Sequence, residues 1–485
     1  MRFQPIYDIA QLCSAKGIKD VVVCPGSRSA PLVLGFTRHP DIQCRVISDE
    51  RSAGFIAIGM AQASQETIAL ISTSGTAAFN FAPAIAEAFY QNTPLVVFTA
   101  DRPKEYIDQK DGQTIHQTNI FGHHVKKSFE LPQEYEHEDS KWHINRLVNE
   151  AINIACEFPA GPVHINAPFR EPLYSEGGNF QYTKNIRVIK KSRKNFTSGI
   201  PTEDLAKLAK HKKILVVCGQ QQRDNKLLNA LDHFSKVYSL PVVGDITSNI
   251  HTLSNAILHG DSFLAECGES VKESLKPDLL ITLGNSVLSK NLKQFLRKYR
   301  AIEHWHLQES GYVADTFQQL STHISVHPVV FFEAFNVKIE STDFDHQKRE
   351  NYLRLWEAEE NRTKKSMERF FTQENTSHFH LTKRILLNLP GPCSLHLANS
   401  MSVRYANFVG LSADHKDVEV FCNRGTSGID GCISTCMGHG FKKNHLHILL
   451  TGDMALFYDR NAFWHSYAYP NLRIVLLNDH GGGIF

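Results

Sequence analysis

The chain reads Asp20-Val-Val-Val-Cys-Pro-Gly-Ser-Arg-Ser-Ala-Pro31 where a short β-branched run gives way to a glycine turn and then to a proline suited to a helix start. Further β-branched runs alternate with helical patterns up to residue 166, at 45–48, 67–72, 94–99 and 162–166. Strands that alternate with helices are typical of a parallel, doubly wound sheet. The sequence therefore begins with a predicted α/β domain.

The same alternation returns twice. Strands are predicted at 214–218, 241–243, 278–283 and 304–307, and again at 393–397, 418–422, 446–450 and 473–477. We therefore predict an α/β chain of three doubly wound parallel-sheet domains, with bounds 1–175, 190–340 and 375–485. Polar residues 174–198 are predicted to form a solvated linker, and the charged residues 344–376 a solvated connecting helix.

The last residues, Gly481-Gly-Gly-Ile-Phe485, follow a predicted strand, where a parallel sheet would normally continue into a covering helix. We expect a truncated form of a longer chain, with an incomplete third domain.

Composition excludes several classes of protein. Hydrophobic residues make up 42% of the 485 residues, which fits a folded protein with large cores. Lys and Arg number 52 against 50 Asp and Glu, so neither nucleic acid nor an anionic membrane is an expected partner. Ten cysteines without a C-x-x-C pair, and no apolar stretch near the ~18 residues of a membrane helix, predict free thiols, no membrane insertion and a cytoplasmic location. The 25 histidines are interpreted as packing or surface residues.

Polar residues follow the predicted strands of the first domain, at the edge where doubly wound sheets bind ligands. Ser27 and Arg28 follow the first strand, Glu50 the second and Arg102 the fourth. The alternatives are an exposed arginine beside a capped helix and an acid that only complements a helix dipole. Two arginines on one edge favour carboxylate substrates, because a guanidinium grips a carboxylate through two parallel hydrogen bonds. The run Ser72-Thr-Ser-Gly-Thr-Ala77 suits an anion or polar ligand at a helix start.

The third domain carries oxygen ligands after two neighbouring strands, in Thr451-Gly-Asp-Met-Ala455 and in Leu477-Asn-Asp-His-Gly-Gly-Gly483. Carboxylate and carbonyl oxygens are what Mg²⁺ prefers. Asn423-Arg-Gly-Thr-Ser-Gly-Ile-Asp-Gly431 has glycines that would let backbone amides approach a diphosphate. The chain has neither G-x-x-x-x-G-K-[ST] nor G-x-G-x-x-G, so a P-loop or an ordinary dinucleotide fold is not supported.

These motifs together resemble the thiamine-diphosphate-dependent enzymes. Within that superfamily they resemble the 2-succinyl-5-enolpyruvyl-6-hydroxy-3-cyclohexene-1-carboxylate (SEPHCHC) synthase family of menaquinone biosynthesis. The runs that carry the resemblance are CPGSRSAPL (24–32), SDERSAGF (48–55), STSGTAAFNFAPAIAEA (72–88), TADRP (99–103), NRGTSGIDG (423–431) and GGGIF (481–485). It covers residues 1–172 and about 390–485 and is weaker between them.

The resemblance implies roles for particular residues. Glu50 matches the glutamate that protonates a ring nitrogen of the cofactor's aminopyrimidine, so that the imino tautomer can deprotonate the thiazolium carbon. The positions that match cofactor contacts are Ser427, Gly428, Ile429, Gly452, Asp453 and Met454, and those that match ligands of Mg²⁺, or of Mn²⁺ in its place, are Asp453, Asp479 and the Gly481 carbonyl. The positions that match contacts to the acidic substrates are Ser27, Arg28, Arg102, Gln113, Lys290, Ser400, Arg404 and Arg424.

The resemblance also implies a reaction and an assembly. The expected activity is decarboxylation of 2-oxoglutarate and addition of the succinyl carbanion equivalent to isochorismate. Residues 1–175 become a pyrimidine-binding domain, 190–340 a central α/β domain and 375–485 a diphosphate-binding domain, in a homodimer or homotetramer. Asp479 departs from the asparagine usual at that metal position and adds a negative charge beside the diphosphate.

Two rival functions remain at this stage. Another thiamine-diphosphate-dependent 2-oxo acid decarboxylase or carboligase, such as acetohydroxyacid synthase, would need fewer arginines. A non-catalytic cofactor-binding module would release no carbon dioxide from any keto acid.

Overall fold

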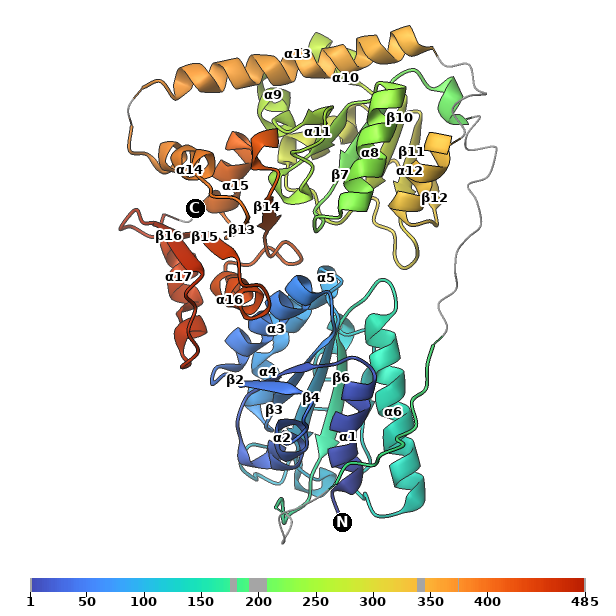
Figure 1. Ribbon diagram of the computed structural model, residues 1–485, viewed down its shortest axis with the longest axis vertical. Helices are drawn as coiled ribbons and strands as arrows, with labels where there is room; N and C mark the ends of the chain where they lie inside the picture. Colours follow the sequence, from blue (N-terminus) through green and yellow to red (C-terminus); the bar gives the residue numbers. More distant parts are fainter. Residues whose placement is uncertain (1, 175–180, 192–206, 338–344, 374, 484–485) are drawn as a thin grey trace. The chain divides into compact units, whose positions relative to one another are not determined.

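A computed structural model describes residues 2–174, 181–191, 207–337, 345–373 and 375–483 (Figure 1). Parts of the predicted linker and of the connecting segment, at 175–180, 192–198, 344 and 374, lie outside these residues. The described strands form three parallel sheets, of six, six and four strands. The chain divides into two compact units: unit 1 is 1–193 with 423–485, and unit 2 is 194–422. The α/β prediction is confirmed.

The first sheet has the strand order β2-β1-β3-β4-β6-β5, with every neighbouring pair parallel. Its strands are β1 (Asp20–Val23), β2 (Gln43–Val46), β3 (Ile68–Ser72), β4 (Leu95–Asp101), β5 (Ser128–Glu130) and β6 (Val163–Pro168). The chain builds outward in opposite directions from β1 and β3, so the topological switch point lies between these two strands. Gly26 marks how closely the loops approach there, because a Cβ atom on it would lie 2.3 Å from the Cβ of Thr73.

Alternate residues of each central strand enter two separate cores. On β3, Ala69 and Ile71 belong to one core and Ile68 and Leu70 to the other. The first core is closed by α1 (Gln4–Ala15), α2 (Ala30–Thr37) and α6 (Glu138–Cys156), and the second by α3 (Glu50–Ser64) and α5 (Ala82–Tyr90), with the short α4 (Thr76–Asn80) before α5. Because both faces are covered, the central strands β1, β3 and β4 are buried along their whole length.

The C-terminal segment of unit 1, which begins at residue 423, packs on the α3 side of this sheet. It contains α16 (Cys432–Lys442), β15 (Leu446–Gly452), α17 (Asp453–Tyr458) and β16 (Leu472–Leu477), and β15 and β16 are parallel. A Cβ atom on Gly59 of α3 would lie 2.0 Å from the carbonyl oxygen of Thr435, and one on Gly438 of α16 would lie 2.1 Å from that of Ile56. Only glycine allows the two helices to approach this closely.

Unit 2 contains the second sheet, with the order β12-β11-β10-β7-β8-β9. Its strands are β7 (Ile214–Cys218), β8 (Val242–Gly244), β9 (Ala256–Ile257), β10 (Leu279–Leu283), β11 (Glu303–Leu307) and β12 (Thr322–Ile324), and the parallel pair β13 (Cys393–Leu397) and β14 (Val418–Phe421) follows in the chain. Its helices are α8 (Asn225–Tyr238), α9 (Gly260–Glu266), α10 (Glu269–Leu275), α11 (Lys290–Lys298), α12 (Pro328–Val337), α13 (His346–Phe370), α14 (His378–Leu387) and α15 (Met401–Val409).

The connecting helix α13 is less solvated than its composition predicts. Trp356 is 0% exposed and Tyr352 is 2% exposed, and both belong to the core under β10 and α11. Glu360 of the same helix is buried and pairs with His259 at 2.7 Å. The helix therefore closes one face of the central sheet while its charged face meets water.

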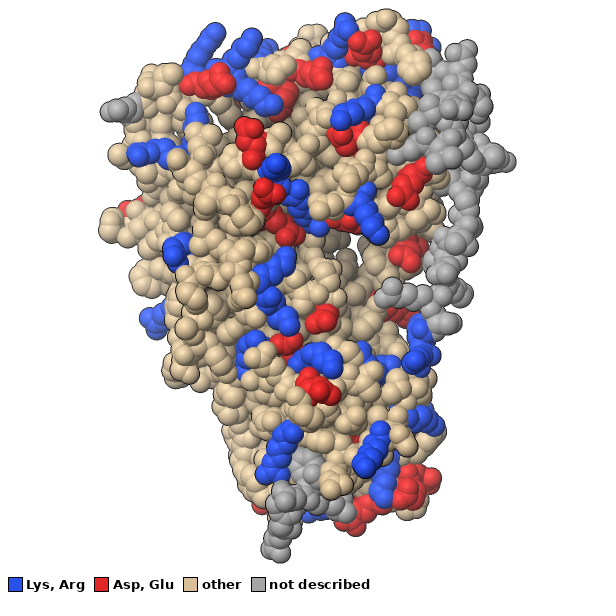
Figure 2. All heavy atoms as spheres, in the orientation of Figure 1, with Lys and Arg blue, Asp and Glu red and all other residues tan. Residues whose placement is uncertain are grey.

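Basic and acidic side chains are mixed over the face of the protein drawn in Figure 2, in keeping with the net charge of +2. Within the described residues, no helix has the length and apolar character needed to cross a membrane. All ten cysteines are described, and none of them forms a disulfide.

Candidate active site

The carboxyl edge of the first sheet gathers the predicted residues of the N-terminal segment. Ser27 and Arg28 lie in a 3-10 turn (Ser27–Ser29) after β1, and Glu50 is the first residue of α3. Arg102 directly follows β4, and Gln113 lies in the next loop with a left-handed φ of 55°. All come from loops at one end of parallel strands, the position that the sequence predicts for a ligand site.

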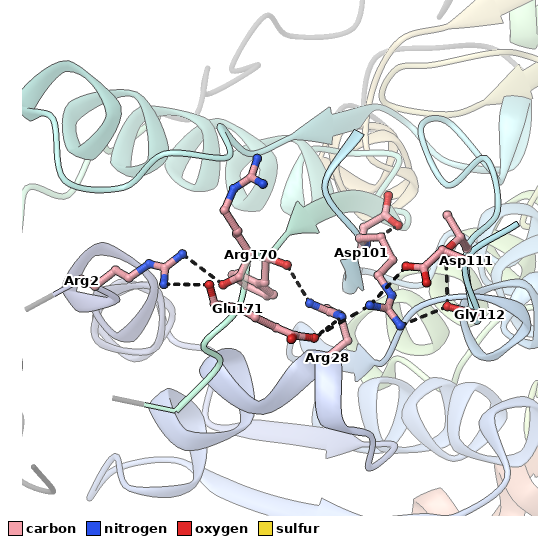
Figure 3. A network of polar contacts seen from close by, with 10 residues as sticks. Arg2, Arg28, Asp101, Asp111, Gly112, Arg170 and Glu171 are labelled. Carbon is pink, nitrogen blue, oxygen red and sulfur yellow. Dashed lines mark hydrogen bonds and ion pairs between the residues drawn. The ribbon is translucent and has the colours of Figure 1, made fainter. Parts of the chain in front are cut away.

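Arg28 and Arg102 converge on one carboxylate. The Arg28 side chain is 6% exposed; its Nη1 donates to the carbonyl of Phe169 at 3.0 Å and its Nη2 to Glu171 Oε1 at 2.9 Å (Figure 3). Arg102 Nη1 lies 3.9 Å from the same Glu171 oxygen and 3.4 Å from Asp111 Oδ2. The two guanidinium groups thus face the same carboxylate oxygen, that of Glu171 Oε1.

The backbone before Arg102 is fixed by a buried carboxylate. Asp101 accepts from the Arg102 amide at 2.7 Å and from Asn166 Nδ2 at 2.8 Å. Burial raises the pKa of Asp101, although both hydrogen bonds oppose this effect. The neighbouring Arg102 Nη2 donates to the Gly112 carbonyl at 3.1 Å, which ties the loop with Gln113 to the end of β4.

Glu50 stands at the start of α3, a helix with a regular amino-terminal cap. Asp49 precedes it and accepts from the Ser52 amide at 2.8 Å and from Asn461 Nδ2 at 2.9 Å. The Glu50 carboxylate is half-buried and accepts a long hydrogen bond of 3.4 Å from Asn80 Nδ2. Among the described residues no basic side chain forms an ion pair with Glu50. The carboxylate therefore keeps an oxygen for a ligand's ring nitrogen.

The run Ser72-Thr-Ser-Gly-Thr-Ala77, which begins at the last residue of β3, contains three buried hydroxyl groups. The hydroxyls of Ser72, Thr73 and Ser74 are buried and have no hydrogen-bond partner among the described residues. The next amide, of Gly75, donates to Gln117 Oε1 at 2.8 Å. Buried hydroxyls are normally satisfied, so this run fits a polar group of a bound molecule.

The loop between β14 and α16 is organised by a residue that sequence reasoning missed. Glu87 of α5 is 1% exposed and accepts from the amides of Gly425 and Thr426 at 2.8 and 2.6 Å. Its carboxylate also accepts from the Thr426 hydroxyl at 2.6 Å. Glu87 thereby fixes the backbone that carries Arg424, Ser427, Gly428 and Ile429. Ser427 itself has a left-handed φ of 63°.

The predicted metal ligands lie at the carboxyl ends of β15 and β16. Asp453 begins α17 and accepts from the Met454 amide at 2.7 Å. Asp479 accepts from the amides of Gly481 and Gly483 at 2.9 and 3.1 Å, and the Gly481 hydrogen bond is the main cause of its lowered pKa. Asp453 also contributes to this lowering of the Asp479 pKa, so the two side chains interact.

This donor set fits a hard divalent cation held partly by diphosphate oxygens. Two carboxylates and a backbone carbonyl supply three oxygens, and Mg²⁺ takes its remaining ligands from phosphates and water. In the described part of the chain there is no group of three or more His, Cys, Asp or Glu side chains at metal-binding distance. The space beside Gly452 is open, because a Cβ atom on it would meet nothing within 4 Å.

Three predicted residues belong to unit 2. Lys290 is exposed at the first position of α11, after β10, and Ser400 caps α15 with a left-handed φ of 69°. Arg404 is exposed in the second turn of α15. Lys290 follows the carboxyl end of a parallel strand, and Ser400 and Arg404 follow that of β13.

Unit 2 also has a cavity of about 470 Å³ that none of the predicted residues lines. Its wall includes His251, His259, Lys364, Phe371 and Lys383. The sequence motifs that predict the active site therefore contribute no residue to the wall of this cavity.

Models of thiamine-dependent families match most of this chain. The N-terminal TPP binding domain of the thiamine pyrophosphate enzymes matches residues 7–120, and the middle domain of thiamine pyrophosphate enzymes matches residues 182–392. The first match contains Glu50, Arg28 and Arg102.

Curated relatives cover almost the whole chain. A 2-succinyl-5-enolpyruvyl-6-hydroxy-3-cyclohexene-1-carboxylate synthase of Cytophaga hutchinsonii is 44% identical over 99% of this chain and 84% of its own length. Proteins with the same name from Flavobacterium johnsoniae and Bacteroides fragilis are each 38% identical, over 98% and 99% of this chain and 83% of their own lengths.

Proposed function

The chain belongs to the SEPHCHC synthase family of thiamine-diphosphate-dependent enzymes, and from this membership we propose that it decarboxylates 2-oxoglutarate and joins the remaining succinyl unit to isochorismate. The products are SEPHCHC, a menaquinone precursor, and carbon dioxide. The structural observation that carries the proposal is the convergence of Arg28 and Arg102 on one carboxylate at the sheet edge where α3 begins with Glu50.

We assign Glu50 the role of proton donor and acceptor toward the aminopyrimidine ring of thiamine diphosphate. When bound, this cofactor supplies the electron sink that makes loss of carbon dioxide feasible. Glu50 suits its role because it is half-buried, stands at a helix amino terminus and forms no ion pair with a described basic residue. Gly452, Met454, Ser427, Gly428 and Ile429 are assigned to hold the cofactor.

Asp453, Asp479 and the Gly481 carbonyl are assigned to Mg²⁺, or to Mn²⁺ in its place. Their positions after the neighbouring parallel strands β15 and β16 support this assignment. The charge of Asp479, where the family usually has asparagine, should tighten binding of the cation.

The basic residues are assigned to the acidic substrates. Arg28 and Arg102, together with Ser27 and Gln113, are proposed to bind carboxylate groups, and the same role is proposed for Lys290, Ser400, Arg404 and Arg424. Five positive charges suit a keto-diacid and the carboxylates of isochorismate. A simple 2-oxo acid such as pyruvate would need fewer.

The proposed assembly is a homodimer or homotetramer in the cytoplasm. Its active site would lie between the pyrimidine-binding domain of one subunit, residues 1–175, and the diphosphate-binding domain of another, residues 375–485, with the central domain at 190–340. The absence of disulfides among the ten described cysteines fits a reducing compartment.

The test is carbon dioxide release from 2-oxoglutarate by the purified protein with thiamine diphosphate and Mg²⁺, with and without isochorismate. Release that rises strongly with isochorismate supports the synthase. Equal release in both conditions indicates a plain 2-oxo acid decarboxylase, and no release at all indicates a non-catalytic cofactor-binding protein.

A variant tests the assignment of Glu50. Glu50→Gln should lower turnover at least about 100-fold, because the amide cannot exchange a proton with the cofactor ring. Glu66→Gln is the matched control, an exposed acid just beyond the other end of α3, and should keep normal turnover. Turnover of Glu50→Gln close to that of the control would remove the assigned role.

A further inference from the structure

Glu171 occupies the place between the two arginines where a substrate carboxylate is expected. It follows the buried end of β6, and its Oε1 accepts from Arg28 Nη2 at 2.9 Å and lies 3.9 Å from Arg102 Nη1. Figure 3 shows Glu171 beside Arg28 with the Asp111 loop close by. A single oxygen of the protein, Glu171 Oε1, thus interacts with both guanidinium groups.

The backbone of Glu171 is anchored independently of its carboxylate. Arg2 donates from Nη1 to the Glu171 carbonyl at 3.3 Å and from Nη2 to the Arg170 carbonyl at 3.1 Å (Figure 3). Arg170 in turn forms an ion pair with Glu105. The side chain can therefore change its rotamer while the main chain stays in place.

Some guanidinium nitrogens of Arg28 and Arg102 are already hydrogen-bonded to backbone carbonyls, which limits the nitrogens that a second carboxylate can use. Arg28 Nη1 is engaged by the Phe169 carbonyl and Arg102 Nη2 by the Gly112 carbonyl. Arg102 Nε has no partner among the described residues but is buried, so the nitrogens that now face Glu171 are the accessible ones, and an incoming anion competes with Glu171 for them.

The exposed fractions of the Glu171 and Asp111 side chains indicate which of the two a substrate carboxylate displaces. The Glu171 side chain is 68% exposed, whereas Asp111, which lies 3.4 Å from Arg102, is 36% exposed. Glu171 can turn into water because its own side chain is already largely exposed, whereas the Arg28 guanidinium stays buried. Its departure leaves two guanidinium groups with one residual acid, a net positive charge that favours an anionic substrate.

We propose that Glu171 sets the affinity of the substrate site: its carboxylate stands in for the substrate carboxylate on Arg28 and Arg102 and is displaced when substrate binds. This inference rests on the proposed function, since it takes the two arginines as substrate ligands. Before substrate binds, Glu171 keeps the two guanidinium groups in place. By competing for them it lowers the affinity of the site for every anion, so that only a ligand with further contacts binds well.

The test measures binding of glutarate, an unreactive dicarboxylate, by calorimetry on the full chain with thiamine diphosphate and Mg²⁺ present. Glu171→Gln should bind glutarate about fivefold more tightly than the wild type, because the amide no longer competes for the guanidinium groups. Glu105→Gln is the matched control, which removes one negative charge beside Arg170 without touching Arg28 or Arg102, and should change binding less than about twofold. Glu171→Asp, with its shorter reach, should fall between wild type and Glu171→Gln.

Weaker binding by Glu171→Gln would overturn the proposal and make Glu171 a residue that only positions the arginines. Binding equal to the wild type would also overturn it. Carbon dioxide release by the same preparations separates this inference from the proposed function. Tighter glutarate binding without release leaves the competition intact and refutes the synthase, whereas release without tighter binding does the reverse.

Discussion

Glu87→Gln should loosen the loop that carries Arg424 and Ser427 without changing the volume of the core. The Glu87 carboxylate accepts from the Gly425 amide on one oxygen and from the Thr426 amide on the other. A glutamine amide has one acceptor and one donor group, so in either orientation its NH₂ faces a backbone N–H. The substitution therefore loses at least one hydrogen bond to a charged acceptor and sets two donors against each other.

The magnitude follows from these contacts. A hydrogen bond to a charged group contributes about 1.5–3 kcal/mol, and an unsatisfied buried donor costs about 1–3 kcal/mol. Because Gly425 is half-buried and Thr426 is exposed, water replaces part of the loss. We therefore expect the loop to open more easily by about 2 kcal/mol, which corresponds to about 30-fold.

Hydrogen exchange measured by mass spectrometry resolves this change locally. Peptides that contain the Gly425 and Thr426 amides should exchange about 30-fold faster in Glu87→Gln than in the wild type. The amide of Gly75, bound to Gln117, is an internal reference, and Glu66→Gln is the control for removal of an exposed charge. Unchanged exchange in the 423–431 loop would refute the claim that Glu87 organises it.

Two further substitutions test the packing and the electrostatics of unit 1. Gly59→Ala places a Cβ 2.0 Å from a carbonyl oxygen of α16 and should lower the unfolding free energy by about 2 kcal/mol, which is the overpacking penalty less the helix preference of alanine. The control is Gly268→Ala, whose Cβ would meet nothing within 4 Å and which should lower it by under about 1 kcal/mol. Both values are measured by urea denaturation, and equal losses would contradict the close helix contact. Burial raises the pKa of Asp459 from 3.8 to about 6, so its contribution to stability is full below pH 3.8 and is lost as pH rises through about 6. The unfolding free energies of the wild type and Asp459→Asn should therefore diverge by about 3 kcal/mol in favour of the variant between pH 4 and 7, and parallel curves would show that this carboxyl does not titrate as described.

The sheets were predictable because their central strands, such as β3, β7 and β10, are buried on both faces and consist mainly of apolar residues. The prediction for β7 matches to the residue, and β2 was placed two residues late, at 45–48 against Gln43–Val46. The strands β5, β9 and β12 were missed because each has only two or three residues, too few to show a period of two. Neighbouring strands of the same sheets hold these short segments in extended form.

The candidate site was predictable where residues follow strands, and not where tertiary contacts give a residue its role. Arg28 and Arg102 could be found because each follows a parallel strand. Glu171 and Glu87 could not, because Glu171 lies outside the quoted motifs and Glu87, although inside the run 72–88, shows no partner in the sequence. Their roles come from residues 69 or more positions away in the sequence, such as Arg102 and Gly425, that only the fold brings near.

Unit 1 is built from two chain segments separated by about 230 residues, and this separation has a consequence for synthesis on the ribosome. Residues 1–193 are finished first, yet α3 has its glycine face bare until α16 is made. At about 5–20 residues per second that interval lasts about 10 to 50 s. During it the face of α3 that packs on α16, which includes Gly59 and Ile56, stays uncovered, and exposed apolar surface of this kind is what chaperones bind. We therefore expect the yield of folded protein to depend on chaperone supply during translation more than on the stability of the finished enzyme.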